Sequence, residues 1–452
     1  MKRALLLSVV ASTMIMAGGD IAAAPAVTAE SDWGEIFGQS RTFYVDRTYS
    51  GSFVNNRNSL ATGGYIGYKT PEFSGFTAVV AAYGTVSLDI HDITPEDDAG
   101  TWAKYDPSLF GRGGENYGFI GQAYINYKYE NTNLKVGRMR LDTPLAGADD
   151  ARMLPNLFEA AVLSNTDIES TTLIAAHVNR ETVGTFGNIY GGGGLGLTSG
   201  YGLGMNEALS GKFVNMGTVA LGHNDVNGNG STDNSTSGVT AFAAVYTGIE
   251  GLKVQAWDYI AWDILNAVYI DGDYTIGVNE AAKVKLSAQY INETDIGDAF
   301  AAEVDTNYVA GKITGIYDAF SAYFAYSTTG KSDTATANGG VITPWGGMPA
   351  YTQGMVTRHQ FFANTDTWKV AGTYNLKDYG VKASVYYTNF DIGAENSYDH
   401  GHAWTASESG WDVTYKVSQV DGLSLRARAN YPRDFKDGLD WDEYRLIVNY
   451  NF

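Results

Sequence analysis

Apolar and polar side chains alternate one by one along much of the chain, which is the pattern of a β-strand with two different faces. One clear run has an apolar side formed by Ala123, Ile125, Tyr127 and Tyr129. The segments 381–388 and 423–431 alternate in the same way. A half-buried strand of a soluble protein has this period too, so a single segment does not decide between the two classes. The recurrence of long alternating segments with aromatic ends favours a transmembrane β-barrel.

The final residues form the most regular of these segments. One side of this segment carries Tyr444, Leu446, Val448, Tyr450 and Phe452, and the other side is mostly polar. An amphipathic last strand that ends in phenylalanine resembles the C-terminal signal that the barrel assembly machinery of outer membranes recognises. We therefore expect Tyr450 and Phe452 to act as the assembly signal.

The segments between the expected strands are of two kinds. Short turns such as 376–380 and 419–422 suit the periplasmic side of an outer-membrane barrel. Long polar stretches suit the outer side, and these are 89–118, 187–211, 224–238 and 328–360. The composition does not break along the chain, so we predict one all-β, antiparallel transmembrane β-barrel over residues 30–452. Its length allows about 16 to 18 strands, and 18 is the favoured number.

Residues 1–29 are expected to be a signal peptide that is removed on export. Lys2 and Arg3 form a short positive region, and a mostly apolar run follows as far as Ala17. That run is shorter than the roughly 20 residues that a helix needs to span a bilayer. Small residues then precede the expected cleavage point after Ala29. An exported barrel of this kind is located in the bacterial outer membrane.

The composition removes several other classes of protein. The chain has a net charge of −20, with 54 glycines, 31 tyrosines, 9 prolines and no cysteine. The phosphates of a nucleic acid would repel such an acidic chain, so no nucleic-acid partner is expected. The lack of cysteine excludes thiol catalysis and cysteine-ligated metals. No stretch after the signal is apolar over the length of a transmembrane helix, which excludes a helical membrane protein.

The segment 134–161 carries a more specific pattern. It contains a strand that ends in Gly137-Arg138, a Thr143-Pro144 turn, the acidic pair Asp149-Asp150 and the run Arg152-x-Leu154-Pro155-x-x-Phe158. This order resembles the strand and third loop of the OprD-type porins. Residues 38–51 and 422–431 resemble the first strand and a late strand of that family. The resemblance implies an 18-stranded barrel whose third loop folds inward and narrows a channel for small, often carboxylate-bearing solutes.

Strand parity places four basic side chains inside the barrel. Arg426 and Arg428 alternate with apolar residues such as Leu425, so the arginines face the lumen if the apolar side faces lipid. An arginine on the lipid face near the midplane would cost about 2–4 kcal/mol. The same test turns Lys382 and Arg445 inward. These four bases would form a column down one wall of the pore.

Such a column resembles the basic ladder of OprD-type porins. Guanidinium groups bind carboxylates through paired hydrogen bonds, and a low-dielectric wall focuses their field. On the expected third loop, Asp149 and Asp150 would form an opposing acidic wall with Arg152 close by. The resemblance adds Arg138 to the expected pore lining. The alternative is that the inward charges are only solvated, or are paired with one another.

These features together predict a porin. It would form a water-filled, loop-constricted channel for small hydrophilic solutes and ions, with a preference for anionic or carboxylate-bearing ones. Its other expected partners are outer-membrane lipid and lipopolysaccharide, and a homotrimer is possible. A major structural or adhesive surface protein is an alternative. A barrel enzyme is a further alternative, but no Ser-His or Asp-His motif points to one, so no enzymatic activity is expected.

One stretch resembles the beginning of a calcium loop. Asp225, Asn227 and Asn229 occupy alternate positions, and Gly230 stands at the sixth. Thr236 stands at the twelfth position, where such a loop needs glutamate. A turn rich in Asn, Asp and Gly is the commoner explanation, so no cofactor is expected apart from this calcium candidate in an outer loop.

Overall fold

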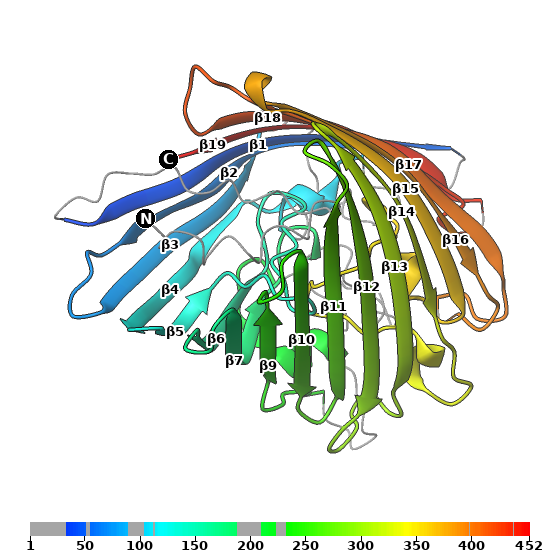
Figure 1. The fold of residues 1–452 in the computed structure, drawn as a ribbon, viewed down its shortest axis with the longest axis horizontal. Coiled ribbons are helices and arrows are strands. Elements are labelled where there is room, and N and C mark those ends of the chain that lie inside the picture. The colour runs from blue at the N-terminus through cyan, green and yellow to red at the C-terminus, as the bar shows by residue number, and fades with distance from the viewer. Residues whose placement is uncertain are drawn as a thin grey trace.

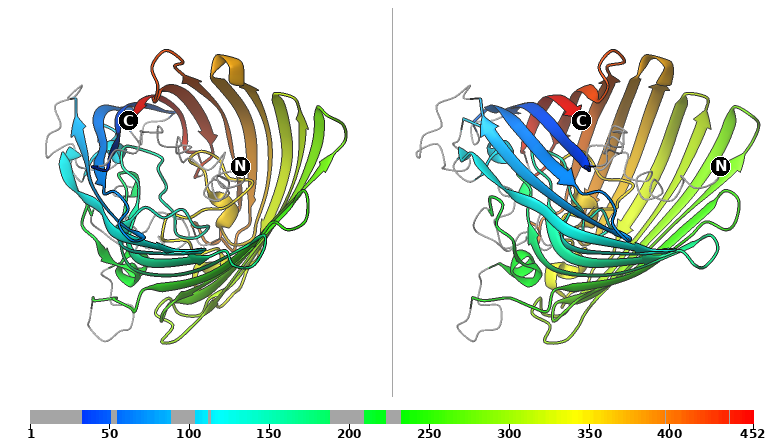
Figure 2. Two further views of the ribbon diagram at one scale, coloured as in Figure 1. Left: turned by 60° about the vertical axis from the view of Figure 1, so that its left-hand side comes forward. Right: turned by 90° about the vertical axis from the view of Figure 1, so that its left-hand side faces the viewer.

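The chain forms one antiparallel sheet that closes on itself as a barrel (Figures 1 and 2). The computed structural model describes residues 33–50, 55–88, 104–111, 114–187, 209–222, 232–396, 398–436 and 438–452. Eighteen long strands make up the wall, which confirms the predicted fold class and the favoured strand number. The two-residue strand β8 is an addition that pairs with the C-terminal end of β7.

The strands of the first half are β1 (Glu35–Ser50), β2 (Arg57–Lys69), β3 (Phe76–Ser87), β4 (Tyr117–Tyr129), β5 (Thr132–Met139), β6 (Leu157–Asn165), β7 (Thr171–Thr182), β8 (Val214–Asn215), β9 (Val239–Tyr246) and β10 (Leu252–Ala261). Those of the second half are β11 (Leu265–Gly277), β12 (Ala282–Asp295), β13 (Asp305–Tyr317), β14 (Phe320–Thr329), β15 (Thr365–Leu376), β16 (Val381–Ile392), β17 (Trp404–Lys416), β18 (Leu423–Arg433) and β19 (Asp440–Asn451).

Pairing of the first and last strands closes the barrel. β19 runs antiparallel to β1 from Gln39 opposite Asn451 to Ser50 opposite Asp440. The other edge of β1 pairs with β2. An unpaired backbone N–H or C=O costs several kcal/mol in hydrocarbon, roughly, so a sheet in lipid must have no open edge. The closed ladder meets this requirement.

The predicted alternation of faces is present in the wall. In β19, Tyr444, Leu446 and Val448 are exposed on the outside, whereas Glu443 and Arg445 are buried on the inside. The same parity continues through the cross-strand partners of these residues. The outer face of this strand is therefore apolar and aromatic from Tyr444 onward, with Asp440 and Asp442 at its start, and Glu443 and Arg445 point inward.

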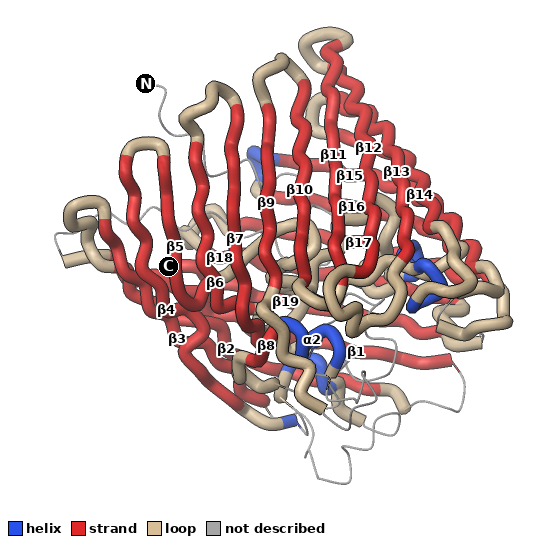
Figure 3. Tube along the Cα trace, turned by 90° about the horizontal axis from the view of Figure 1, so that it is seen from below, coloured by secondary structure: helices blue, strands red, loops and turns tan. Residues whose placement is uncertain are grey.

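Connections of two lengths lie at opposite ends of the strands. Short turns such as 377–380 and 417–422 join strands at one end, and the connections 140–156 and 330–364 lie at the other. Figure 3 shows the hairpin turns at one end and helix α2 at the other. The predicted short turns are present, whereas most of the predicted long stretch 187–211 and parts of 89–118 and 224–238 lie outside the described residues. The predicted long stretch 328–360 lies at the end opposite the short turns, but it does not extend into solvent: most of residues 339–364 are buried because the connection folds into the barrel.

Helices are short and confined to the connections. They are the 3-10 turns η3 (Pro107–Leu109), η6 (Thr336–Gly339), η7 (His359–Phe361) and η8 (Lys377–Tyr379), and the α-helix α2 (Met216–Leu221). Within the described ranges, no helix has the length and apolar character needed to cross a membrane.

Two of the sequence predictions fall outside the described residues. The signal peptide over 1–29 is one of them, and the calcium candidate with Asp225, Asn227 and Asn229 is the other. Both stay predictions.

We predict that Phe452→Ser lowers the amount of folded barrel in the outer membrane. Phe452 N donates to Gly38 O (3.1 Å), Gly38 N donates to Phe452 O (2.9 Å), and the Phe452 ring stacks on Tyr450. The serine variant keeps the backbone pair but loses the terminal aromatic ring. The measurement is the heat-modifiable band in membrane fractions. Tyr444→Ser, on the same face of the same strand, is the control, and equal losses in both variants would contradict a special role for the last residue.

Candidate functional site

The connection between β5 and β6, residues 140–156, folds into the barrel and is called loop L3 below. Arg41 of β1 attaches it to the wall: Arg41 Nη1 donates to Asp150 Oδ1 (2.7 Å) and also to the carbonyl of Arg152. Arg140 Nη1 donates to the other oxygen of the Asp150 carboxylate at 3.1 Å. The predicted inward third loop is therefore present, and Asp150 is its main anchor.

The charge of Asp150 is maintained by these contacts. Burial raises the pKa of this carboxyl, but Arg41 and Arg140 outweigh burial and hold its pKa below the ordinary value. An ionised carboxylate between two guanidinium groups gives charge-assisted hydrogen bonds, which are stronger than neutral ones. The anchor of L3 therefore stays intact throughout the neutral and mildly acidic range.

A second anchor is the buried carboxylate of Glu443 on β19. Arg152 Nη2 of L3 donates to Glu443 Oε1 (2.8 Å), and Arg47 Nε of β1 donates to Glu443 Oε2 (2.5 Å). Arg445 Nε lies 2.9 Å from Glu443 Oε1. Arg152 Nε also donates to Ser108 Oγ, which belongs to the β3–β4 connection. One carboxylate thus joins the wall to two inward connections.

The connection between β14 and β15, residues 330–364, is called loop L7 and meets L3 inside the barrel (Figure 2). Gly147 N of L3 donates to Trp345 O of L7 (3.0 Å). Arg358 Nη2 of L7 donates to Asp149 Oδ1 of L3 (3.2 Å). Trp345 Nε1 reaches Met216 O at the start of α2. These contacts make the two loops one constriction across the lumen.

Glu408 of β17 holds L7 against the wall. Its carboxylate accepts hydrogen bonds from the backbone N–H groups of Met355 (2.5 Å), Val356 (3.2 Å) and Thr357 (2.8 Å), and from the hydroxyl of Tyr386. Gly354 permits the close approach, since a methyl group there would lie 2.6 Å from Glu408 Oε2. This anchor could not be found from the sequence, because only the docked position of L7 shows which inward carboxylate accepts hydrogen bonds from its backbone N–H groups.

The predicted basic column is present on the inner wall, and its members differ in accessibility. Arg426 Nη2 lies 2.6 Å and Arg428 Nη2 3.1 Å from the same oxygen of Asp412 on β17. Lys382 of β16 faces the same lumen, and Thr414 lies between it and Arg426 in the cross-strand register. The Arg426 side chain is 13% exposed, whereas that of Arg445 is 1% exposed. The solvent accessibility of these basic side chains therefore decreases from Arg426 toward Arg445, which lies against the inward loops.

Arg152 and Arg445 were expected to contact a passing solute, and their burial shows that this expectation is wrong. Arg152 and Arg445 lie on the inner side, as predicted, but both are almost fully buried. Their partners are loop and wall groups, including Glu443 for both and Met355 Sδ for Arg445. They hold the constriction in place and do not present a surface to passing solutes.

The expectation that Arg138 lines the pore is wrong. Its cross-strand partner on β4 is Ala123, and on the same face Val136 lies opposite the exposed Ile125. This is the outer face of the barrel. Arg138 pairs there with Glu159 of β6 (2.8 Å). The family pattern gave the position but not the face, whereas simple alternation with the outward residues Leu134 and Val136 places Arg138 outside.

Several lumen-facing lysines were not singled out from the sequence. Lys253 of β10, Lys285 of β12 and Lys312 of β13 alternate with outward residues, so the parity test applied to Arg426 would have found them. Lys312 Nζ lies 3.9 Å from the centre of the Tyr351 ring of L7. Lys285 Nζ lies 2.8 Å from Asp273 Oδ2. The basic lining therefore extends beyond the C-terminal strands.

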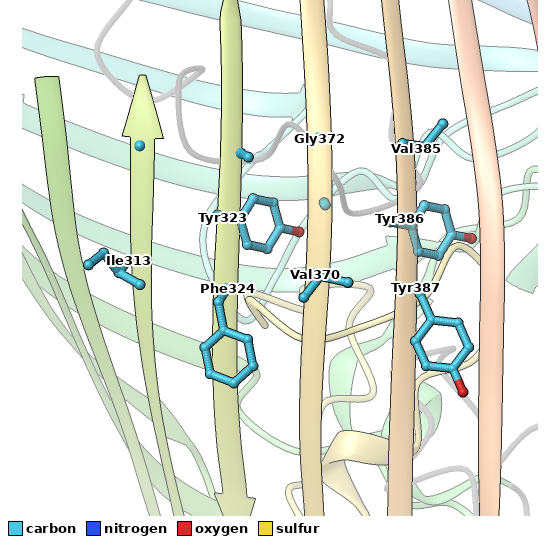
Figure 4. A pocket seen from close by; sticks show the side chains of 11 residues that line it. Ile313, Tyr323, Phe324, Val370, Gly372, Val385, Tyr386 and Tyr387 are labelled. Carbon is cyan, nitrogen blue, oxygen red and sulfur yellow. The ribbon is translucent and has the colours of Figure 1, made fainter. Parts of the chain in front are cut away.

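An apolar groove of about 690 Å³ crosses the wall at β13–β16 (Figure 4). Small residues on these strands, among them Gly315, Ala322 and Gly372, create it. The register places Phe324 and Tyr387 on its outer side. Its lining is apolar apart from tyrosine hydroxyls, so it lacks the polar groups that would orient a hydrophilic solute.

An aromatic cluster covers the end of L7. His359 Nε2 donates to Phe435 O (2.6 Å), and its ring stacks on Phe362 and lies against Tyr398 and Trp404. Burial lowers the pKa of His359 to about 4, so the imidazole is neutral at neutral pH. This cluster ties L7 to the β16–β17 connection, which contains Tyr398, and to the β18–β19 connection, which contains Phe435.

Comparisons with known proteins agree with this architecture. A family model described as outer membrane porin, OprD family, matches residues 35–185 and 215–452. The structure of Acinetobacter baumannii OccAB3 is similar, with a TM-score of 0.71 and 15% identity over 92% of this chain and 98% of that one. Pseudomonas aeruginosa OpdK with vanillate gives a TM-score of 0.68 and 16% identity, over 92% and 98% of the two chains. Identities this low show a shared fold, and no curated protein matches the sequence.

We predict that Glu408→Ala loosens L7. The variant leaves three buried amide groups without their acceptor, which lowers the free energy of unfolding by about 2–4 kcal/mol. Freed loop segments also widen the lumen, so the single-channel conductance rises. Asp391→Asn, on the exposed face of the neighbouring strand β16, is the control. An unchanged conductance and an unchanged urea midpoint would contradict this role.

We also predict that the stability contributed by His359 depends on pH. Its pKa is lower in the folded protein than the ordinary value, so the unfolded chain takes up the proton first as the pH falls. Stability is therefore lost between roughly pH 6.5 and 4, by at most about 2 kcal/mol between pH 7 and 5. Urea unfolding of the wild type and of His359→Gln at both pH values tests this. The gap between the two proteins should shrink at pH 5, and a constant gap would be the contrary result.

Proposed function

Because this chain belongs to the OprD family of outer-membrane porins, we propose that its channel favours small solutes that carry a carboxylate or another anionic group. Membership of this family establishes that the protein is a non-enzymatic channel for small solutes in the bacterial outer membrane. The barrel-enzyme alternative is thereby removed. The preference for anions goes beyond membership and is argued from the charges of the lumen.

The observation that carries the proposal is an excess of arginines over carboxylates on the inner wall. Arg426 and Arg428 share the single carboxylate of Asp412. Three further arginines, Arg47, Arg152 and Arg445, share the two carboxylates of Glu443 and Asp106. Each carboxylate neutralises one positive charge, so the wall formed by β18, β19 and β1 remains positive. In a narrow lumen with low-dielectric walls, this field attracts anions.

The accessible bases form a series and not one deep site. Arg426 is partly exposed, Lys382 lies two strands away at a neighbouring level, and Lys312 continues the lining on β13. A guanidinium group offers a carboxylate a planar pair of donors. Several modest sites in succession let an anion enter and leave, which conduction requires.

The acidic residues of L3 do not cancel this field. Asp150 lies between Arg41 and Arg140, and Asp149 pairs with Arg358. Each acid predicted for the opposing wall is thus compensated by arginine. The structure of OpdK named above contains vanillate, which is an aromatic carboxylate, and this agrees with the proposal.

We predict that Lys382→Gln combined with Arg426→Gln moves the reversal potential toward cation selectivity. The double variant removes two accessible positive charges from the lumen and leaves Arg428 to compensate Asp412. The measurement is the reversal potential of the protein in a planar bilayer under a salt gradient. Carboxylate solutes such as benzoate should also permeate more slowly into liposomes that contain the variant.

Arg433→Gln serves as the matched control, because Arg433 is the last residue of the same strand β18 but faces outward. Asp412→Asn provides the converse test and should raise anion preference. An unchanged reversal potential in the correctly folded double variant would refute the proposal.

A further inference from the structure

Arg138 faces outward, and its surroundings form a small charged site on the outer wall. Glu159 lies opposite it on β6, and Arg180 lies opposite Glu159 on β7. Arg138 Nε lies 2.8 Å from Glu159 Oε1, and Arg180 Nε lies 3.7 Å from Glu159 Oε2. The two arginine side chains are 38% and 56% exposed. One carboxylate thus faces two guanidinium groups, so a net positive charge remains on the outside of the barrel.

The site lies toward the end of the wall that carries the long loops. Arg138 is the residue before the end of β5, and Arg180 is close to the end of β7. On the same outer face, Trp262 Nε1 donates to Thr240 Oγ1 (3.0 Å), and the same hydroxyl contacts His177 Nδ1. A tryptophan that hydrogen-bonds polar groups on a lipid-facing wall is typical of the membrane–water interface. Arg180 follows His177 along β7, and so it lies between this tryptophan site and the end of the wall that carries the long loops.

The rest of this outer rim has the opposite charge. Outward positions near the same ends of other strands carry carboxylates: Asp46, Asp258, Asp305, Asp366, Asp391 and Asp442. Another outward arginine, Arg433, pairs with Asp442 at 2.8 Å. An anionic headgroup is therefore repelled along the acidic parts of the rim and attracted where two arginines share one acid.

Contacts within the protein fix the side chain of Arg138, and the terminal nitrogens of Arg180 remain open to a ligand. The ring of Phe213, from the described segment 209–222, lies 4.4 Å from the guanidinium carbon of Arg138. Arg138 Nη1 donates to Ile120 O at 3.4 Å. Both ion pairs with Glu159 use Nε atoms, so the terminal nitrogens of Arg180 have no partner among the described residues. Fixing a side chain before binding lowers the entropy lost on binding.

We propose that Arg138 and Arg180 bind a phosphate group of lipopolysaccharide in the outer leaflet. The outer leaflet presents the lipid A phosphates at the level of this site, and guanidinium groups bind phosphate through paired charge-assisted hydrogen bonds. Glu159 lies between the two arginines and neutralises one of their two charges. The site lies across the wall from the channel, so it is independent of the proposed anion preference.

The test measures binding of diphosphoryl lipid A to the purified, folded barrel in detergent by native mass spectrometry, with a chelator present to remove divalent cations. The variant Arg138→Ala with Arg180→Ala should bind lipid A about tenfold more weakly than the wild type, as expected for the loss of one or two charge-assisted hydrogen bonds. Arg433→Ala is the matched control and should bind as the wild type does. Glu159→Gln removes the competing carboxylate and should bind lipid A more tightly.

Further ligands identify the group that is recognised. Lipid A without its phosphates should bind equally weakly to all variants, and inorganic phosphate at millimolar concentration should not displace diphosphoryl lipid A. The heat-modifiable band and the conductance should be unchanged in each variant, because no loop anchor is altered. Equal lipid A binding by the double variant and the wild type would overturn the proposal. Displacement by inorganic phosphate would also overturn it, in favour of a site for free anions. If the double variant does not fold, equal binding by Glu159→Gln and the wild type decides against the proposal.

Discussion

A strand in hydrocarbon has to satisfy every backbone hydrogen bond within the sheet, and the structure follows from this constraint. The pairing of β19 with β1 closes the sheet, and the closed sheet fixes which side chains meet lipid and which meet the lumen. Since the side-chain period is two, Leu446 and Val448 can face lipid only if Arg445 faces inward. The charged interior therefore follows from the closure of the sheet, and not only from the function of the barrel as a channel.

Inward charges in turn give the loops their anchors. Glu443, Glu408 and Asp150 are buried carboxylates, and each joins a loop to the wall or to a neighbouring arginine. A buried charge without partners is strongly destabilising, so each of these groups requires its loop to be docked. The arginines left over after this pairing, with the nearby lysines, are the ones that can act on a solute. The same wall thus positions the constriction and supplies the field inside it.

Much of this could be predicted from the sequence, because strand parity is a local property. Alternation alone identified the barrel, its last strand and the inward direction of Arg426, Arg428 and Lys382. Parity also holds at Arg138, which alternates in step with the outward residues Leu134 and Val136. Its direction was assigned from a family pattern and was wrong. Burial of Arg152 and Arg445 depends on how L3 and L7 dock, which residues far apart in the chain decide.

The lumen near Arg426 is expected to have a positive electrostatic potential, and a single introduced cysteine can be used to measure this potential. The chain has no cysteine, so Thr414→Cys places a single thiol between Lys382 and Arg426 on the inner face. The rates at which an anionic and a cationic thiosulfonate of similar size modify this thiol report the local potential. The account predicts that the anionic reagent reacts faster and that added salt reduces the difference. Equal rates, or a faster reaction of the cationic reagent, would contradict it.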